Sequence, residues 1–310
     1  MSQTCRFNRL FVLLAFATLL PAMAQIPEQI APTPNIFTAK IRLEDLSMIL
    51  VPVSINGSGP YDFLLDTGCA KTMVDEKLAG ELGLPRLSEK TVTGVLASVR
   101  MSVVHVNSLS VSGATVPGGE VFSSEHPATV TSKVRGVLGE DFLKNFDVLI
   151  DYRHQVIELE PASGVLAATA EGERLSLQLA GVFQGQPTHN RLVVTGSIPE
   201  LSEKPMALLL DSGANHVTLF RDHLGADTGY TQPMRTGTFG AWTTSVSTTR
   251  TFRSLNLGKS SVGDLTVVGL ARRPYVDIDG LLPTSMFHSI FISHRDRFVI
   301  LNPSFPKMSR

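Results

Sequence analysis

The chain has 310 residues, of which 43% are hydrophobic and 18% are charged, and its formal net charge is −1 at pH 7. This length and composition fit one large or two medium globular domains and exclude a disordered or fibrous chain. The near-neutral charge gives no indication of a nucleic-acid or anionic-membrane partner.

Residues 1–24 have the pattern of a signal peptide. Arg6 and Arg9 precede an almost wholly apolar run, Leu10–Leu20, and Ala22-Met23-Ala24 forms a small-x-small cleavage site. A membrane anchor is the alternative, but the apolar run spans about a dozen residues against the roughly 20 of a spanning helix. We therefore expect a secreted or periplasmic protein with no membrane anchor after cleavage.

Cysteine usage supports a bacterial envelope protein. Cys5 would leave with the signal peptide, so Cys69 would be the one cysteine of the mature chain. An exported chain with a single cysteine has no internal disulfide, unlike most small secreted eukaryotic domains. Cleavage would also move the net charge to about −3, since it removes two arginines and no acidic residue.

The remaining chain has mainly the pattern of β-structure. Residues 25–38 contain three prolines and are expected to form an exposed lead-in. A short helix is predicted over Met73–Leu82, ending at Gly83. The small and polar segment Ala162–Gly172 is the best candidate for a linker, which places an N-terminal lobe at 39–161 and a C-terminal lobe at 173–310. Short apolar or alternating runs predict strands at 39–49, 51–55, 61–65, 90–106, 109–111, 115–122, 148–152 and 155–159.

One motif occurs in both predicted lobes. Phe63-Leu64-Leu65-Asp66-Thr67-Gly68 is an apolar run that ends in a carboxylate, a hydroxyl and a glycine, and Ala207-Leu208-Leu209-Leu210-Asp211-Ser212-Gly213 repeats it. Such a run is typical of a buried strand. A buried strand that delivers a carboxylate into a turn must solvate or pair that charge. Two such turns facing one another would form a carboxylate pair.

The spacing of other landmarks indicates an internal repeat of a whole domain. Asp66 precedes Gly136 by 70 residues, and Asp211 precedes Gly280 by 69. The runs 148–161 and 290–303 also match and both end in proline. Chance similarity of two apolar runs would not keep this order and spacing, so we predict a duplication.

Other candidate motifs have simpler interpretations. Asp227-Thr228-Gly229 has the same letters but no preceding apolar strand, so it is interpreted as a turn. The histidine spacings fit no metal site, and there is no Gly-x-Ser-x-Gly or phosphate-binding loop, so no metal or cofactor is expected. Single acidic residues are interpreted as helix caps or surface charges: Asp75, Glu76, Asp141 and Asp151.

The two Asp-containing motifs resemble the active-site loops of the aspartic proteases of the pepsin and retropepsin type. Val137-Leu138-Gly139 and Leu281-Leu282-Pro283 resemble the paired apolar segments beneath those loops. The resemblance covers nearly all of residues 39–303. It implies an all-β protein of the acid-protease fold, with two β-barrel-like lobes related by a pseudo-twofold axis and a cleft between them.

The resemblance also implies roles for individual residues. Asp66 and Asp211 would form the catalytic pair, one protonated and one ionised, that activates a water for attack on a peptide bond. Four neighbours would support the active-site loops: Thr67, Gly68, Ser212 and Gly213. The two hydroxyls would bond across the twofold axis, or each would merely cap its own turn. Cys69 is expected to be a small buried filler and not a nucleophile.

The resemblance further implies a hairpin flap over the cleft in each lobe. By order along the chain these flaps fall at Thr91–Arg100, with Gly94 at the tip, and at Met234–Val246. Neither segment has the tyrosine of the pepsin-type flap. Trp242 would face substrate or belong to the core. Pro283, where the first copy has Gly139, is a further departure from the pattern.

The sequence therefore predicts an aspartic-type endopeptidase that acts as a monomer on a peptide or protein in the cleft between the lobes. One alternative is a protease-like protein of the cell envelope that binds an extended peptide without cutting it. Another is a homodimer in which the two aspartates never meet within one chain. The linker argues against the homodimer, since about ten residues suffice to join adjacent lobes.

Overall fold

The computed structural model describes thirteen stretches of the chain, and all structural statements below concern these residues. They are residues 35–45, 47–94, 98–125, 133–161, 164–178, 181–183, 186–188, 191–202, 204–220, 224, 230–238, 241–271 and 277–305. The predicted signal peptide and the turn motif at Asp227 lie outside them. No helix among these residues has both the length and the apolar character needed to cross a membrane.

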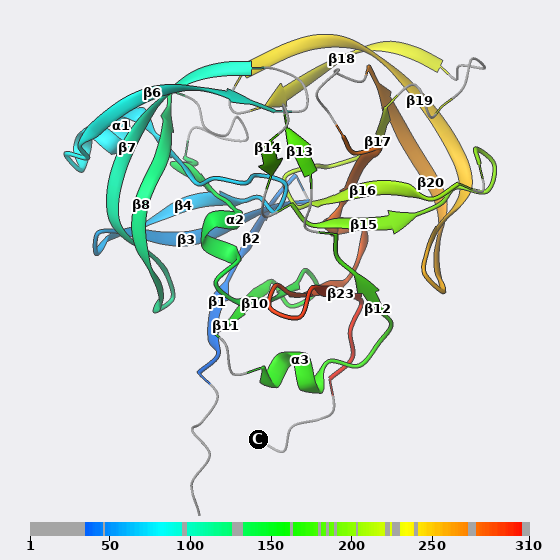
Figure 1. Ribbon diagram of the computed structural model, residues 1–310, viewed down its shortest axis with the longest axis horizontal. Coiled ribbons are helices and arrows are strands. Elements are labelled where there is room, and N and C mark those ends of the chain that lie inside the picture. The colour runs from blue at the N-terminus through cyan, green and yellow to red at the C-terminus, as the bar shows by residue number, and fades with distance from the viewer. Residues whose placement is uncertain are drawn as a thin grey trace, which may run out of the picture. The chain divides into compact units, whose positions relative to one another are not determined.

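The protein is all-β, as predicted. Strands follow one another from Phe37 to Leu301, and most alternate buried and exposed side chains or end in fully buried runs. One sheet holds eight strands from the N-terminal part of the chain (Figure 1). Its order is β2 (Arg42–Glu44), β3 (Met48–Ile55), β4 (Ser58–Leu65), β9 (Gly136–Leu138), β5 (Met73–Asp75), β8 (Ala114–Ser124), β7 (Ser98–Val111) and β6 (Arg86–Thr93).

A second sheet of seven strands repeats this order from β3 onward. Its order is β15 (Val193–Gly196), β16 (Met206–Asp211), β21 (Gly280–Pro283), β17 (Val217–Phe220), β20 (Ser260–Leu270), β19 (Ala241–Leu257) and β18 (Tyr230–Thr238). In both sheets the strand that leads to the aspartate pairs in parallel with the short Gly-apolar-apolar strand: β4 with β9, and β16 with β21. Equivalent pairings therefore surround Asp66 and Asp211.

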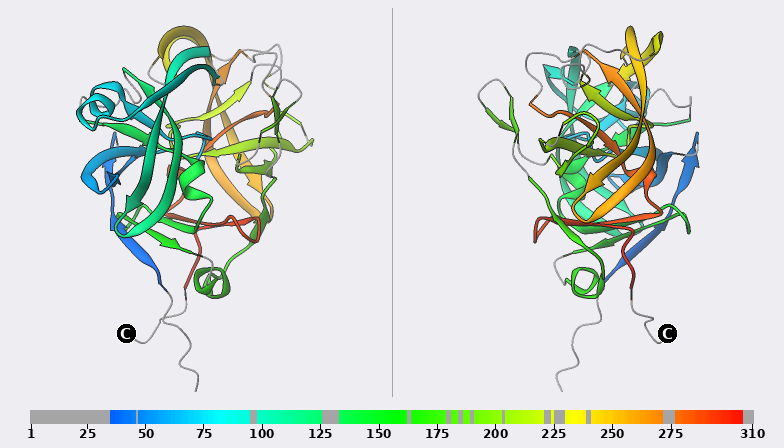
Figure 2. Two further views of the ribbon diagram at one scale, coloured as in Figure 1. Left: turned by 60° about the vertical axis from the view of Figure 1, so that its left-hand side comes forward. Right: turned by 90° about the vertical axis from the view of Figure 1, so that its right-hand side faces the viewer.

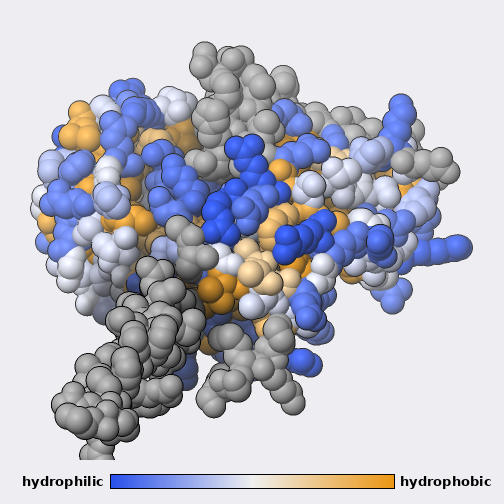
Figure 3. Space-filling view, turned by 60° about the horizontal axis from the view of Figure 1, so that its bottom comes forward, coloured by the Kyte–Doolittle hydropathy of each residue, from blue (hydrophilic) through white to orange (hydrophobic). Residues whose placement is uncertain are grey.

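A third sheet takes strands from both parts of the chain. Its order is β1 (Phe37–Lys40), β11 (Val156–Glu160), β10 (Asp147–Asp151), β22 (Ser289–Ser293), β23 (Phe298–Leu301) and β12 (Arg174–Ser176). It lies below the other two sheets in Figure 1 and is seen from two further sides in Figure 2. The face beneath it is largely hydrophilic, with a smaller hydrophobic area near its centre (Figure 3). Because β10 pairs directly with β22, backbone hydrogen bonds join the two predicted lobes.

The main hydrophobic core is likewise shared between the two parts of the chain. One cluster of buried side chains runs from Ala39 to Val299 and includes Phe63, Leu65, Leu208 and Leu210, all fully buried. Burial of each such side chain stabilises the fold by about 1.5–3 kcal/mol. The strands that carry the two aspartates are therefore anchored in the same core.

The described helices are short, and two of them, α1 and α3, differ from the sequence predictions. The segment predicted as a helix, Met73–Leu82, begins as strand β5, and α1 covers Glu76–Glu81. Asp75 ends the strand and caps the helix, with its carboxylate accepting a hydrogen bond from Leu78 N at 3.3 Å. The predicted linker contains a helix, α3 (Val165–Thr169). The remaining described elements are α2 (Glu140–Leu143), the 3-10 helix η1 (Thr284–Met286), and the paired strands β13 (Gly181–Phe183) and β14 (Gln186–Thr188).

Both segments predicted as flaps lie in antiparallel hairpins. β6 pairs with β7 up to Thr93 opposite Ser98, so the chain reverses between these two residues. β18 pairs with β19 up to Thr238 opposite Ala241. Both hairpins are longer than predicted, and β6 and β18 lie at the same end of the structure (Figure 1). Trp242 stands opposite Gly237, but its side chain lies outside what the structure describes.

Candidate active site

Each aspartate follows a fully buried strand end. Leu65 and Leu210, the residues immediately before Asp66 and Asp211, have no exposed surface. The N–H of Asp66 continues the parallel pairing by donating to Leu138 O at 3.0 Å, and Asp211 stands opposite Pro283 in the register of β16 and β21. The buried strands thus fix the backbone position of both aspartates.

Thr67 and Ser212 form reciprocal hydrogen bonds between the two loops. Thr67 Oγ1 donates to Leu210 O at 2.9 Å and accepts from Ser212 N at 3.0 Å. Ser212 Oγ donates to Leu65 O at 2.8 Å and accepts from Thr67 N at 3.0 Å. Both side chains are only 1% exposed. The hydroxyls therefore bond across the axis, and neither merely caps its own turn.

The glycines of the two loops bring the carboxyl groups together. Gly68 N donates to Asp66 Oδ1 at 2.9 Å, and Gly213 N donates to Asp211 Oδ1 at 2.8 Å. A Cβ at Gly68 would lie 2.6 Å from Asp211 Cγ, and one at Gly213 would lie 2.7 Å from Asp66 Oδ2. The two aspartates thus meet within one chain, contrary to the homodimer alternative.

The pair has raised pKa values. Burial raises the pKa of Asp66 well above its usual value, and the charge of Asp211 and a hydrogen bond with its carboxyl group raise it further. Burial raises the pKa of Asp211 to about 6, although Gly213 N–H and the hydrogen bond with Asp66 act in the opposite direction. Both residues are half-buried. The arrangement can hold one proton between two carboxyl groups beside a water.

The loop after Asp66 rests on the start of α2. Thr72 N and Oγ1 donate to Asp141 Oδ1 at 2.9 and 2.7 Å, and Thr72 Oγ1 accepts from Gly139 N at 3.2 Å. A Cβ at Gly139 would lie 2.7 Å from Cys69 O, so glycine is required for this approach. Asp141 was predicted to be a cap or a surface charge, and that prediction is wrong. Sequence analysis overlooked Thr72 and Asp141 because a contact across 69 positions leaves no local pattern.

Cys69 is buried beneath the first loop. Its side chain is 5% exposed, and Sγ donates to Lys71 O at 3.0 Å. Burial raises the pKa of the thiol well above its usual value, and the charge of Asp66 raises it further. A thiol that stays protonated is a poor nucleophile. These surroundings fit the predicted role of a small buried filler.

The segment that pairs with the Asp211 strand, β21 with η1, is built differently from β9 with α2. Pro283 extends β21, and buried Thr284 follows it at the start of η1. Thr284 Oγ1 lies 2.5 Å from the phenolic oxygen of Tyr152, a residue from the turn after β10. Among the residues that the structure describes, no group of three or more His, Cys, Asp or Glu side chains could hold a metal ion.

Comparison with known proteins agrees with this geometry. The family described as aspartyl protease matches residues 51–142, which include Asp66, Thr67, Gly68 and the first three residues of α2. The resemblance to the pepsin and retropepsin type is confirmed, and the match supports an aspartic protease activity in general terms. No curated protein matches the chain. Among solved structures, a retropepsin-like aspartic protease from Rickettsia conorii is 16% identical, covers 42% of this chain and 94% of its own, and has a TM-score of 0.32.

Proposed function

We propose that the protein is an aspartic-type endopeptidase in which Asp66 and Asp211 together activate a water molecule. Two carboxylates about 3 Å apart repel by roughly 5 kcal/mol at an effective dielectric of about 20, so such a pair retains one proton. This sharing is a general property of aspartic proteases. The raised pKa values of both residues support it here.

In the proposed mechanism the ionised carboxylate takes a proton from the water as the oxygen attacks the peptide carbonyl carbon. The protonated carboxyl group donates a hydrogen bond to the carbonyl oxygen as negative charge develops there. Collapse of the tetrahedral intermediate then needs a proton on the leaving nitrogen, which the pair supplies. The proton belongs to the pair, so neither aspartate is assigned a fixed role.

One observation carries the proposal: the reciprocal hydrogen bonds of Thr67 and Ser212 hold two equivalent aspartate loops face to face. In each case a loop hydroxyl donates to a carbonyl of the opposite strand and accepts from an N–H of the opposite loop. They support a role for Thr67, Gly68, Ser212 and Gly213 in keeping the carboxyl groups in register for a single water.

The test is cleavage of a peptide library by the mature protein from acid to neutral pH, beside Asp66→Asn and Asp211→Asn. Each substitution keeps the side-chain shape and removes the ionisable group. We expect each to abolish cleavage while circular dichroism and thermal unfolding show an intact fold. Asp264→Asn is a matched control, because Asp264 is exposed and has a φ of 50°, a conformation that asparagine also adopts. Cleavage that survives either substitution would contradict the proposal.

An inactive wild-type protein at every pH would favour the alternative, a peptide-binding protein of the cell envelope that does not cut. Binding of library peptides by the same protein would then separate that alternative from a protein with no peptide partner. We expect neither a metal nor an organic cofactor to be required, so dialysis against a chelator should leave cleavage unchanged.

We further propose that the protein acts as an exported monomer, secreted or periplasmic, on peptides or proteins there, and that its two lobes arose by internal duplication. The signal-peptide pattern of residues 1–24 and the equal strand order of the two sheets support these points. Cell fractionation with N-terminal sequencing tests export, and light scattering of the purified protein tests the monomer. A mature chain that begins at Met1 would contradict cleavage of the signal.

A further inference from the structure

Two side-chain contacts cross between the lobes at equivalent places. Tyr152 follows β10, and its hydroxyl meets Thr284 Oγ1 at 2.5 Å. His294 follows β22, the strand that pairs with β10, and its Nε2 meets Glu140 Oε2 at 2.9 Å. Thr284 and Glu140 stand just beyond the equivalent strands β21 and β9. Each lobe therefore sends one side chain to the segment beneath the other lobe's aspartate loop.

The Glu140 contact reaches the loop of Asp66 through the backbone. Glu140 N donates to Cys69 O at 2.8 Å, and the preceding residue, Gly139, donates to Thr72 Oγ1 at 3.2 Å. Cys69 in turn donates its N–H to Asp66 O at 3.3 Å. A shift of Glu140 would therefore be passed on to the residues that hold Asp66.

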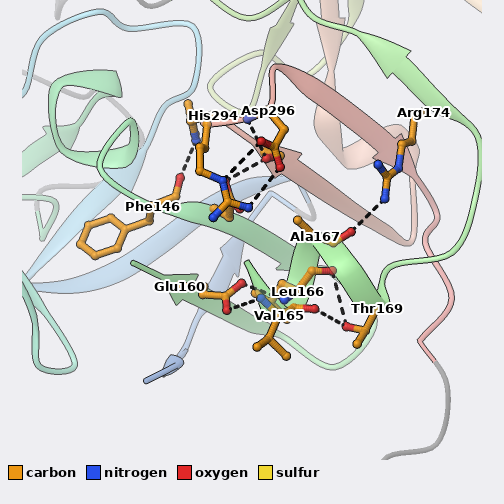
Figure 4. Close-up of polar contacts among 12 residues, drawn as sticks. Phe146, Glu160, Val165, Leu166, Ala167, Thr169, Arg174, His294 and Asp296 are labelled. Atoms are coloured by element: carbon orange, nitrogen blue, oxygen red, sulfur yellow. Dashed lines mark hydrogen bonds and ion pairs between the residues drawn. The ribbon is translucent and has the colours of Figure 1, made fainter. Parts of the chain in front are cut away.

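The two contacts differ in chemistry. Tyr152 and Thr284 form a hydroxyl pair, whereas His294 and Glu140 are an ionisable pair whose side chains are 7% and 0% exposed. His294 Nδ1 also lies 2.7 Å from Phe146 O, toward which the ring points in Figure 4. A carbonyl oxygen can only accept, so Nδ1 must donate. When Glu140 is ionised, Nε2 must donate as well, and both bonds together require the imidazolium form.

The ionised carboxylate of Glu140 depends strongly on its hydrogen bond with His294. Its other carboxyl oxygen, Oε1, is buried and has no hydrogen-bond partner among the described residues. A neutral His294 would have a single N–H and would lose either Phe146 O or Glu140. Loss of the imidazolium would therefore leave a fully buried carboxylate without compensation, which is strongly unfavourable.

We infer that His294 is a positioning residue for the Asp66 loop and that its imidazolium form, bonded to Glu140, holds this loop in its catalytic geometry. The inference rests on the proposed function. It gives the two aspartates different supports, since the contact beneath Asp211 is not ionisable near neutral pH. Deprotonation of His294 would loosen one loop and leave the other in place.

Several charged groups face this pair. Glu140 is on α2 together with Asp141, and Lys144 follows that helix; Asp147 is on β10, and Arg295 follows His294. Burial lowers the pKa of His294, but Glu140, Phe146 O and Asp147 together raise it above 6.5. Burial raises the pKa of Glu140 above 4.5, although His294 acts against this. A raised histidine pKa means that the contact is complete below about pH 6.5 and is lost as pH rises through the folded value.

The first test is independent of activity. We expect nitrogen NMR of the imidazole of His294 in the whole mature protein to show both ring nitrogens protonated at pH 6.5, with a midpoint above that pH. The Gly139 amide should lose hydrogen-exchange protection above the same midpoint. A neutral ring at pH 6.5, or unchanged protection of Gly139, would overturn the inference even if the protein is an active protease.

The second test replaces the ionisable His294–Glu140 pair by the kind of hydroxyl pair that Tyr152 and Thr284 form. The double variant Glu140→Thr and His294→Tyr places a tyrosine and a threonine at these two positions, as in the Tyr152–Thr284 contact. It also avoids the unpaired carboxylate that His294→Tyr alone would leave. We expect the double variant to cleave peptide at pH 6 within about threefold of the wild-type kcat. Its kcat should persist to higher pH than the wild-type kcat, which should fall about tenfold as His294 loses its proton, and its KM should change little.

The matched control is His154→Gln, because His154 is an exposed histidine whose partner, Asp151, takes part in neither contact between the lobes. It should keep the wild-type pH profile. An alkaline fall with the same midpoint in the wild type and the double variant would overturn the inference, as would a changed profile in the control alone. If the wild type cleaves no peptide, the proposed function fails, and the NMR and exchange measurements still decide whether His294 holds the loop.

Discussion

Gly68 lies directly against the carboxyl group of Asp211, and a Cβ at this glycine would stand 2.6 Å from Asp211 Cγ. The relationship is mutual, since a Cβ at Gly213 would stand 2.7 Å from Asp66 Oδ2. Neither glycine has a positive φ, so space and not backbone conformation requires glycine here. Each loop approaches the other's aspartate closely only because it lacks a side chain at this position.

Gly68→Ala should therefore displace the Asp211 carboxyl group. We expect a loss of at least a hundredfold in kcat/KM, because about 1 Å of misplacement at a reacting group costs that much. Overpacking should also lower the free energy of unfolding by about 1–3 kcal/mol, measured by urea titration. Gly80→Ala is the control, since nothing lies within 4 Å of its Cβ and it stands within α1. It should be neutral or stabilise by about 0.5–1 kcal/mol. Equal effects of the two substitutions would contradict the role of space at Gly68.

Thr67→Val should uncouple the two loops. The substitution keeps the shape of the side chain but leaves Leu210 O and Ser212 N without the partner they share. Each buried polar group left unpaired costs about 1–3 kcal/mol, so we expect a loss of about 2–5 kcal/mol in stability and a large fall in kcat. Thr67→Ser keeps the hydroxyl and should retain most of both. A valine variant as stable as the serine variant would show that the cross-axis bonds contribute little.

The pH dependence of cleavage should follow the raised pKa values of the pair. The active form carries one proton, and it appears only after the first proton leaves. Because the pKa of Asp211 is raised to about 6 and that of Asp66 well above its usual value, kcat should rise through about pH 6 and persist toward neutral pH. An unperturbed pair would give this rise near pH 4. A rate maximum below pH 4 would contradict the raised values.

The same raised pKa values predict that stability falls with rising pH, whereas kcat rises. Carboxyl groups with raised folded pKa values bind more protons folded than unfolded, so stability falls as pH rises above about 4. Asp211→Asn removes the part of this dependence that comes from Asp211 and from the effect of its charge on Asp66. We expect the melting temperature of the variant to exceed that of the wild type at pH 7 and to approach it at pH 4. A variant less stable than the wild type at both pH values would be inconsistent with this prediction.

Glu160 should be required for α3. Its two carboxyl oxygens each accept a 2.7 Å hydrogen bond, from Val165 N and Leu166 N, and the side chain is fully buried (Figure 4). Glu160→Ala leaves both N–H groups without this partner and should lower the free energy of unfolding by about 2 kcal/mol or more. Thr169→Ala, which removes only a hydroxyl bonded to the helix carbonyls, should cost less than 1 kcal/mol. Similar losses for both would mean that the cap is unimportant.

Much of the site could be predicted from local sequence. Leu64-Leu65 and Leu209-Leu210 are apolar because they are buried strand ends, and the residues that follow must turn and solvate a carboxylate. The repetition of this pattern was enough to predict a pair of facing aspartates. The two hairpins at Thr91–Arg100 and Met234–Val246 were predicted from the family resemblance and the order along the chain.

Contacts between distant segments could not be predicted in this way. The bond of Thr72 to Asp141 and that of His294 to Glu140 join elements whose spacing carries no pattern. Asp141 was therefore interpreted as a cap or a surface charge, and Glu140 was not singled out. The helix α3 inside the predicted linker depends on Glu160, which lies outside that segment. The sequence by itself determined which residues enter the two loops, because burial and turn chemistry act locally. Only the tertiary structure decided which residues hold those loops in place, because packing brings their partners together across the whole chain.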